Sequence, residues 1–262
     1  MKNNETNAFL FVTHKVNSEV MRRFLKLQYE TKSLGNAFFL INQENNKVLE
    51  LDAYDDITPY VFNVNSLNGL NYEPIRETII PGSNHFATLQ FYLDYPIFKY
   101  YWVIEYDVVF TGHWDIFFSS FNNFDADFIA SHIERYTDNP NWIWWETLHL
   151  NGVVLQDYQY IKSFNPIYRI STGALSYLDS LLKYRKNWGH HEVLIPTALN
   201  YSKFKIMDIG GCGDFSITNS CKISAFVRNN LNESTMRYRP SIRQEELILE
   251  NKLLHPCKVD ML

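Results

Sequence analysis

Two carboxylates, Glu105 and Asp107, stand at the end of a hydrophobic run in the segment YYWVIEYDVVFTGHW (100–114). Residues two apart in an extended chain point to the same side, so both acids would project together. Hard oxygen ligands at this spacing suit Mg²⁺ or Mn²⁺, which bind one or two carboxylates and keep positions open for phosphate oxygens. The spacing alone also fits a solvated junction between a strand and a loop, and this alternative stays open.

The preceding sequence indicates the elements that would position these acids. A short apolar run at 8–14 predicts a buried strand, and residues 18–30 carry the apolar spacing of a helix with Ser18 as its N-cap. A second buried strand is predicted at 36–42. Strand, helix and strand in close succession are typical of a βαβ unit in a parallel sheet. Ligands of such sheets bind beyond the carboxyl ends of the strands, where the two acids stand.

The remainder of the chain predicts further elements around the same sheet. They are a helix at 83–96, strands at 99–107, 125–133 and near 167–171, helices at 173–185 and 190–200, and a strand at 204–209. Ser241 and Gln244 have capping-box spacing, which predicts an amphipathic helix in the C-terminal segment 240–258. No repeat, low-complexity block or linker divides the sequence, so we expect a single domain over residues 1–262.

The composition is that of a globular protein. The 262-residue chain is 46% hydrophobic and 20% charged, which is too apolar for disorder. Its net charge of −5 offers no general basic character, so no nucleic-acid partner is expected. The start lacks a signal-peptide core, no run approaches the ~20 apolar residues of a membrane span, and three cysteines without paired spacing indicate reduced thiols. We therefore expect a soluble cytoplasmic protein, at most peripheral to a membrane.

The metal motif carries a family resemblance. Glu105-Tyr106-Asp107 resembles the D-x-D motif that ends a central strand in GT-A glycosyltransferases, with Glu in place of the first Asp. The wider segment 100–114 resembles the E-x-D…T-G-H segment of a poorly characterised glycosyltransferase-like family. The resemblance implies an α/β GT-A fold, with a mostly parallel Rossmann-like central sheet flanked by helices. It also implies Asp107 as a metal ligand, and Glu105 as a contact to the donor ribose or to the metal.

The same resemblance implies roles for the two halves of the chain. Residues 1–133 would form the nucleotide-sugar-binding half, and residues 134–262 the acceptor-binding half with the C-terminal helix. In the second half, ISTGALSYL (170–178) resembles a glycine-containing loop that approaches the donor sugar. This assigns Ser171, Thr172 and Gly173 to donor binding. Ser171 or Thr172 could equally be the N-cap of the helix that follows, and both functions can hold at once.

Two later segments match in the order that the fold expects. NWGHHEVLIPT (187–197) resembles the helix start that presents an acid to the acceptor, which implies Glu192 as the catalytic residue. Either His190 or His191 could bind the acceptor or orient Glu192, and we take His191 as the acceptor contact. Val193 stands where a second acid often occurs, and Glu192 could instead be only the first-turn partner of a helix dipole. KLLHPCK (252–258) resembles the late metal-binding histidine, so His255 would complete the metal shell and Lys258 would neutralise a donor phosphate.

Weaker matches extend the donor and acceptor sites. Residues at the end of the first strand would meet the nucleotide base and diphosphate; these are Thr13, His14 and Lys15. Asp52 would contact a uridine or ribose, although a surface turn is the simpler interpretation. Trp144 and Trp145, in a tryptophan-rich segment, would form a platform for the acceptor or a packed hinge; both interpretations stay open.

Together these matches favour a glycosyltransferase dependent on Mn²⁺ or Mg²⁺. It would move a sugar from a nucleotide-diphosphate donor, with a UDP-sugar favoured, to a hydroxyl of a glycan or glycolipid acceptor. Inversion and retention of configuration both stay open. One alternative is a nucleotidyltransferase of related fold, although VTHKVNSEV (12–20) lacks the glycines of its phosphate loop. The other is a carbohydrate-binding protein without catalytic activity.

Overall fold

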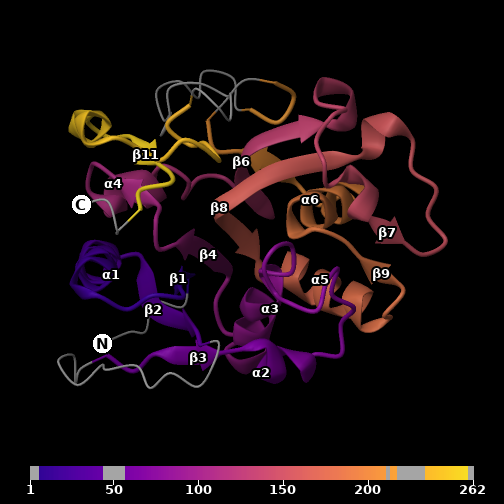
Figure 1. Ribbon diagram of the computed structural model, residues 1–262, viewed down its shortest axis with the longest axis horizontal. Coiled ribbons are helices and arrows are strands. Elements are labelled where there is room, and N and C mark those ends of the chain that lie inside the picture. The colour runs from indigo at the N-terminus through magenta and orange to yellow at the C-terminus, as the bar shows by residue number, and fades with distance from the viewer. Residues whose placement is uncertain (1–5, 44–56, 211–212, 217–233, 259–262) are drawn as a thin grey trace.

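A seven-stranded sheet in the order β10-β6-β8-β4-β1-β2-β3 forms the centre of the computed structural model, which describes residues 6–43, 57–210, 213–216 and 234–258 (Figure 1). The strands are β1 (Asn7–Thr13), β2 (Gly35–Asn42), β3 (Tyr60–Phe62), β4 (Tyr100–Glu105), β6 (Phe128–Arg135), β8 (Ile161–Ser171) and β10 (Ile206–Asp208). All neighbours pair in parallel except β8, which runs antiparallel to both β4 and β6. The expected α/β fold with a mostly parallel sheet flanked by helices is confirmed.

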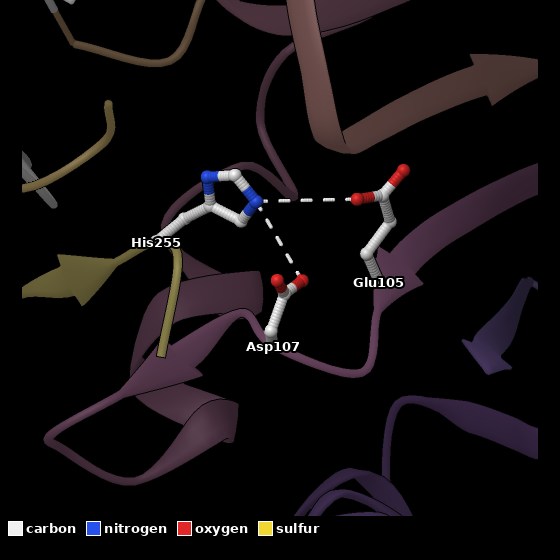
Figure 2. A group of neighbouring side chains, drawn as sticks. All are labelled: Glu105, Asp107 and His255. Carbon is white, nitrogen blue, oxygen red and sulfur yellow. Dashed lines mark ion pairs between the residues drawn. The ribbon is translucent and has the colours of Figure 1, made fainter. Parts of the chain in front are cut away.

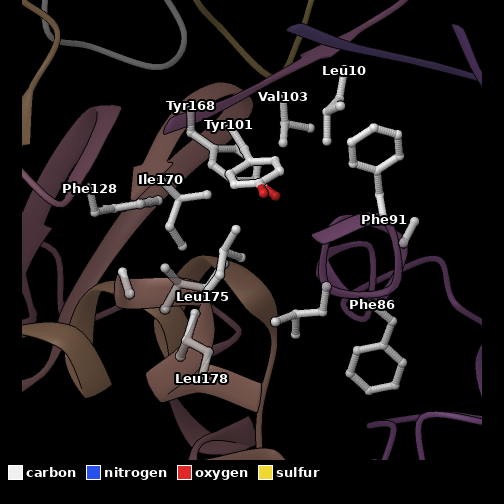
Figure 3. Packing of buried hydrophobic residues seen from close by; sticks show 14 of the residues in the cluster. Leu10, Phe86, Phe91, Tyr101, Val103, Phe128, Tyr168, Ile170, Leu175 and Leu178 are labelled. Atoms are coloured by element: carbon white, nitrogen blue, oxygen red, sulfur yellow. The ribbon is translucent and has the colours of Figure 1, made fainter. Parts of the chain in front are cut away.

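Helices cover both faces of this sheet because alternate residues of its inner strands are apolar on both sides. Phe9 and Phe11 of β1 belong to a core with α1 (Ser18–Thr31) and α4 (Trp114–Ser119). Leu10 faces the opposite core, which Figure 3 shows between the sheet, α3 and α5. The helices on this second face are α2 (Val64–Asn68), α3 (His85–Asp94), α5 (Thr172–Lys183) and α6 (His191–Tyr201).

Two short pairs of strands lie outside the seven-stranded sheet. β5 (Val109–Phe110) pairs antiparallel with β11 (Leu253–Leu254), and β7 (His149–Leu150) pairs with β9 (Asn187–Trp188). Four 3₁₀ turns complete the described elements: η1 (Tyr136–Asp138), η2 (Trp145–Thr147), η3 (Asp157–Gln159) and η5 (Gln244–Ile248). The β5–β11 pair matters most for the site, because it brings the C-terminal segment beside the loop that follows β4. Among the described residues, no helix combines the length and apolar character needed to cross a membrane.

Two local expectations need correction. The N-cap of α1 is Asn17 rather than Ser18, because the Asn17 side chain accepts a hydrogen bond from the backbone of Val20 and Ser18 is already helical. The strand expected near 167–171 is longer than predicted: it begins at Ile161, ends at Ser171 and is buried along its whole length. A longer buried strand fits between β4 and β6 in the middle of the sheet, where it has a neighbour on each side.

The amphipathic helix expected over 240–258 does not form. The segment holds the 3₁₀ turn η5 and the strand β11 instead. Both oxygens of Glu246 accept hydrogen bonds from the guanidinium of Arg237, at 2.8 Å each, and Arg237 also donates to the carbonyl oxygen of Pro240. These tertiary contacts and the pairing of β11 with β5 replace the hydrogen bonds of a helix, although the sequence has a capping-box pattern.

Candidate metal centre

Three side chains that could hold a metal ion converge beyond the carboxyl end of β4 (Figure 2). Glu105 is the last residue of β4, Asp107 lies in the turn that follows, and His255 comes directly after β11. One potential ligand atom of each lies within 4.8 Å of the others. The structure therefore brings together the three residues that the sequence motifs predict as metal ligands, from segments about 150 positions apart.

The loop 105–108 is shaped by its backbone hydrogen bonds. Tyr106 continues the ladder with β1 by donating to the carbonyl oxygen of Val12 at 2.9 Å, and Val108 turns back to donate to Glu105 at 2.9 Å. Cys257 donates its N–H to the carbonyl oxygen of Asp107 at 2.8 Å. This last bond ties the segment that carries His255 to the loop that carries Asp107.

A buried arginine of α1 joins the same two segments. Arg23 Nη1 donates to the carbonyl oxygen of Tyr106 at 3.1 Å and to that of Cys257 at 2.8 Å. Its Nε donates to Glu19 at 2.8 Å, which balances the charge of the guanidinium. Arg23 thus holds the acidic loop and the histidine segment in one position, a role that no sequence motif indicated.

The imidazole of His255 is oriented for metal binding. Its Nδ1 lies 2.8 Å from the carbonyl oxygen of Arg237, so Nδ1 carries the hydrogen and donates it. The unprotonated Nε2 then faces the acids, 3.6 Å from Asp107 Oδ1 and 4.0 Å from Glu105 Oε2. Burial lowers the pKa of His255 below its usual range, and this favours the neutral form that binds metals.

The acids crowd one another, and Lys258 is the one cation that pairs with them among the described residues. Asp107 is 2% exposed; its Oδ2 accepts a close hydrogen bond from Lys258, while its Oδ1 has no hydrogen-bond partner among the described residues. Loss of hydration and the nearby charges of Asp107 and Glu192 raise the pKa of Glu105 to about 8. A buried carboxylate oxygen without a donor beside a second acid and a correctly oriented imidazole fits a divalent cation.

Glu192 lies close enough to the candidate ligands for its charge to act on Glu105. It stands in the first turn of α6, with its Oε1 accepting from the backbone of Asn165 at 3.1 Å and its Oε2 3.8 Å from His190 Nδ1. Burial raises its pKa to about 7, although the Asn165 hydrogen bond and the charge of Lys162 oppose this shift. A carboxyl group with this pKa can accept a proton near neutral pH.

The residues predicted at the end of β1 lie at the same edge of the sheet. Val12 of β1 is opposite Glu105 of β4, so the residues after it emerge beside the acidic loop. The ring of His14 meets that of Tyr106 at 5.1 Å, edge to face. Thr13 shapes this loop end, because its hydroxyl donates to the carbonyl oxygen of Lys15 at 2.6 Å. Asp52 lies outside the described residues.

The glycine-containing loop is not part of this edge. Ser171 is opposite Tyr100, at the other end of β4 from Glu105, a separation of roughly 17 Å at the usual rise per residue. Ser171 caps α5 by accepting from Ala174, and the Thr172 hydroxyl donates to the carbonyl oxygen of Phe98. The structure therefore does not bring Ser171, Thr172 and Gly173 to the metal centre. Their capping interpretation is the one that the contacts support.

Of the predicted acceptor residues, Trp144 is half-buried, whereas Trp145 and His191 are buried. The ring of Trp144 stacks on His190 at 4.6 Å, next to the start of α6. Trp145 is buried, and its indole N–H donates to the carbonyl oxygen of Asn139 at 2.8 Å, so its ring is packed rather than presented. His191 is buried, with its Nδ1 3.4 Å from the amide nitrogen of Asn165.

Comparisons with known proteins are distant. No protein-family model matches the chain, and no curated protein matches it significantly. A glycosyltransferase involved in glycosylation of the major capsid of PBCV-1 resembles it with 9% identity and a TM-score of 0.33, over 67% of this chain and 63% of that chain. Mouse xyloside xylosyltransferase 1 has 13% identity and a TM-score of 0.38, over 79% of this chain and 86% of that chain. The inositol-1-phosphate CTP transferase from T. maritima has 9% identity and a TM-score of 0.42, over 82% of this chain and 88% of that chain. Such low values identify no family.

The raised pKa of Glu105 predicts a pH-dependent effect of Glu105→Gln on the metal-free protein. Folded Glu105 keeps its proton up to about pH 8, whereas the unfolded side chain loses it near pH 4.5. Its contribution to stability is therefore complete below about pH 4.5 and is lost as the pH rises toward 8. Glutamine resembles the protonated acid, so the variant should gain stability over wild type as the pH increases.

Thermal unfolding in EDTA at intervals from pH 5 to pH 8 measures this difference. The melting temperature of Glu105→Gln minus that of wild type should rise across the range. Glu245→Gln, at a side chain that is 65% exposed, is the matched control and should give a flat difference. A flat difference for Glu105→Gln as well would contradict the pKa assignment.

Proposed function

We propose that this protein is a divalent-metal-dependent glycosyltransferase that moves a sugar from a nucleotide-diphosphate donor to a hydroxyl of a glycan or glycolipid. A UDP-sugar is the favoured donor. The observation that carries the proposal is the convergence of Glu105, Asp107 and His255 at the carboxyl end of β4, with Glu192 facing them. This is the edge at which open α/β sheets bind their ligands.

The donor diphosphate would bind at the acidic loop. Asp107, His255 and Glu105 would hold Mn²⁺ or Mg²⁺, which supplies charge neutralisation for the departing nucleoside diphosphate. Lys258, which pairs with Asp107, adds a second positive group within reach of the same phosphates. His14 and Lys15 emerge beside Tyr106 at the end of β1 and would line the nucleotide side of the site.

Glu192 would act on the acceptor. Its position across from Glu105 and its pKa of about 7 suit a base that takes the proton of the acceptor hydroxyl. In an inverting reaction the acceptor oxygen then bonds to the anomeric carbon as the bond from that carbon to the diphosphate breaks. His191 and Trp144, which adjoin the start of α6, would contact the acceptor. A retaining reaction would give Glu192 another role.

Metal-linked nucleotide binding is the first prediction of this proposal. UDP should raise the melting temperature of wild type in the presence of Mn²⁺, because a ligand at 100 times its dissociation constant adds about 2.7 kcal/mol to stability. For a chain of this size that corresponds to roughly 5–10 °C. Asp107→Asn should lose the shift, since it removes a metal ligand that is 2% exposed.

A thermal-shift panel of UDP, GDP, CMP and ADP, together with the triphosphates UTP and CTP, each with Mn²⁺ or with EDTA, makes the measurement. Asp115→Asn is the control, because Asp115 is exposed on α4 and pairs with His113 away from the centre. A protein that binds sugars without any metal-linked nucleotide would be a carbohydrate-binding module instead. Stabilisation by a nucleoside triphosphate with Mn²⁺, but by no diphosphate, would indicate a nucleotidyltransferase.

The role of Glu192 predicts a selective loss of catalysis. Glu192→Gln should lower the rate of nucleotide release from the sugar-nucleotide donor by roughly 100-fold to 10,000-fold. Nucleotide binding should persist, because Glu192 is not among the metal ligands. The wild-type rate should rise with pH around a midpoint near 7, as Glu192 becomes ionised.

Steady-state assays of nucleoside diphosphate release, with water or an added glycan as acceptor, test this role. Glu73→Gln, at a surface residue paired with Arg185, should keep the wild-type rate and pH profile. If Glu192→Gln retained the full rate with an unchanged pH profile, Glu192 would not be the base.

A further inference from the structure

Buried polar atoms without partners gather between the start of α3 and the start of α6. Among the described residues they include Ser83 Oγ, Asn84 Oδ1, both ring nitrogens of His85, and Asn165 Oδ1. Ser83 is 1% exposed, His85 3% and Asn165 2%. Leaving such groups without hydrogen bonds costs folding free energy, so a cluster of them is a place that bound water or the polar groups of a ligand would complete.

The segment that carries three of these residues is held firmly against α6. The backbone N–H of His191 donates to the carbonyl oxygen of Gly82 at 2.8 Å. Gly82 has a φ of +106°, and a Cβ there would lie 2.2 Å from the Ile75 side chain and 3.0 Å from the His190 ring. Only glycine fits this junction without displacement of its neighbours. The polar atoms of Ser83, Asn84 and His85 are therefore held in a fixed position beside α6.

Contacts between rings and amides make these groups one continuous cluster. The ring of His85 stacks on that of His191 at 6.2 Å, and His191 Nδ1 lies 3.4 Å from the amide nitrogen of Asn165. The remaining Asn84 and Ser83 precede His85 directly in the chain. We call these five residues, Ser83, Asn84, His85, Asn165 and His191, the neutral polar cluster.

The neutral polar cluster lies between the candidate metal centre and the candidate base. On one side, the Asn84 side chain lies close enough to Glu105 to lower the pKa of that carboxyl slightly. The backbone of Asn165 donates to Glu192 Oε1 at 3.1 Å on the other side. The part of a substrate that lies between the diphosphate and the acceptor hydroxyl would therefore contact this cluster.

The chemistry of the cluster matches hydroxyl groups. Burial lowers the pKa of His85 to about 3, so its imidazole is neutral and offers one donor and one acceptor. The amides and the serine hydroxyl likewise both donate and accept. The cluster itself contains no lysine or arginine. Two cations lie beyond it. Lys162, near Glu192, forms an ion pair with Glu134 at 2.7 Å. Arg76, near His190, lies over the Trp144 ring at 5.5 Å. A carboxylate or sulfate would find no cationic partner within the cluster.

We propose that Ser83, Asn84, His85 and Asn165 bind the hydroxyl groups of an uncharged sugar, the glycosyl group of the donor. This inference rests on the proposed function and narrows its substrate class to neutral hexoses or pentoses. Sugar acids are excluded, because a carboxylate buried against neutral groups loses its hydration without gaining an ion pair.

The test compares each sugar nucleotide with its own nucleoside diphosphate. Calorimetric titration in Mn²⁺ measures the dissociation constants of UDP-glucose, UDP-galactose, UDP-glucuronic acid and UDP, and of GDP-mannose and GDP. Wild type should bind at least one neutral sugar nucleotide more tightly than the diphosphate, and UDP-glucuronic acid more weakly than UDP-glucose. His85→Phe and Ser83→Ala should each weaken the neutral sugar nucleotide by roughly 2-fold to 10-fold and leave the diphosphate unchanged.

Thr31→Val is the control, because it removes a buried hydroxyl from α1, on the opposite face of the sheet. It should change neither the dissociation constant of the sugar nucleotide nor that of the diphosphate. The inference is overturned if both cluster variants bind the sugar nucleotides as wild type does, or if they weaken the diphosphate equally. Ser83→Ala keeps the test usable if His85→Phe fails to fold. A wild type that binds no nucleotide with Mn²⁺ would instead overturn the proposed function, and the inference with it.

Discussion

One buried guanidinium links the parts of the chain on which the candidate site depends. Arg23 of α1 donates to the carbonyl oxygens of Tyr106 and Cys257, and so fixes the acidic loop against the segment that carries His255. The Cys257–Asp107 backbone bond, the Lys258–Asp107 ion pair and the two-residue β5–β11 ladder join the same two segments. Metal ligands need positions fixed to fractions of an ångström, and such fixing comes from the hydrogen bonds behind them. The geometry of the centre is therefore a property of α1 as much as of the motif.

The site combines two opposite electrostatic environments. Around Asp107, carboxylates crowd together and Lys258 is the nearest cation, which favours a bound divalent ion. Next to these acids, burial keeps His85 and His191 neutral, and amide and hydroxyl groups lie without hydrogen-bond partners among the described residues. A substrate with a charged diphosphate at one end and an uncharged, hydroxyl-rich group at the other would satisfy both. Glu192, with its pKa near neutrality, stands where these environments meet.

The sequence predicted the start of the fold and the ends of its strands well, because buried strands and an amphipathic helix leave clear apolar patterns. It placed Glu105, Asp107 and His255 together through motif order. The position of Ser171 could not be predicted, because the local sequence does not indicate the direction of β8 in the sheet. β8 runs antiparallel to β4 and therefore ends at the edge of the sheet opposite Glu105. Nor could the sequence indicate a role for His85, since a polar residue in the first turn of an apolar helix resembles an ordinary helix start. The absence of a helix between residues 240 and 258 follows from the contacts of Arg237, which only the tertiary structure supplies.

The central claim is that Glu105, Asp107 and His255 form one metal site. Crystals of the protein grown with Mn²⁺ and UDP, measured at a wavelength where manganese scatters anomalously, test it directly. We expect an anomalous peak about 2.0–2.3 Å from Asp107 and His255, with diphosphate oxygens on its open side. A peak bound elsewhere on the chain, or nucleotide density at this edge of the sheet with no metal beside Asp107, would contradict the account.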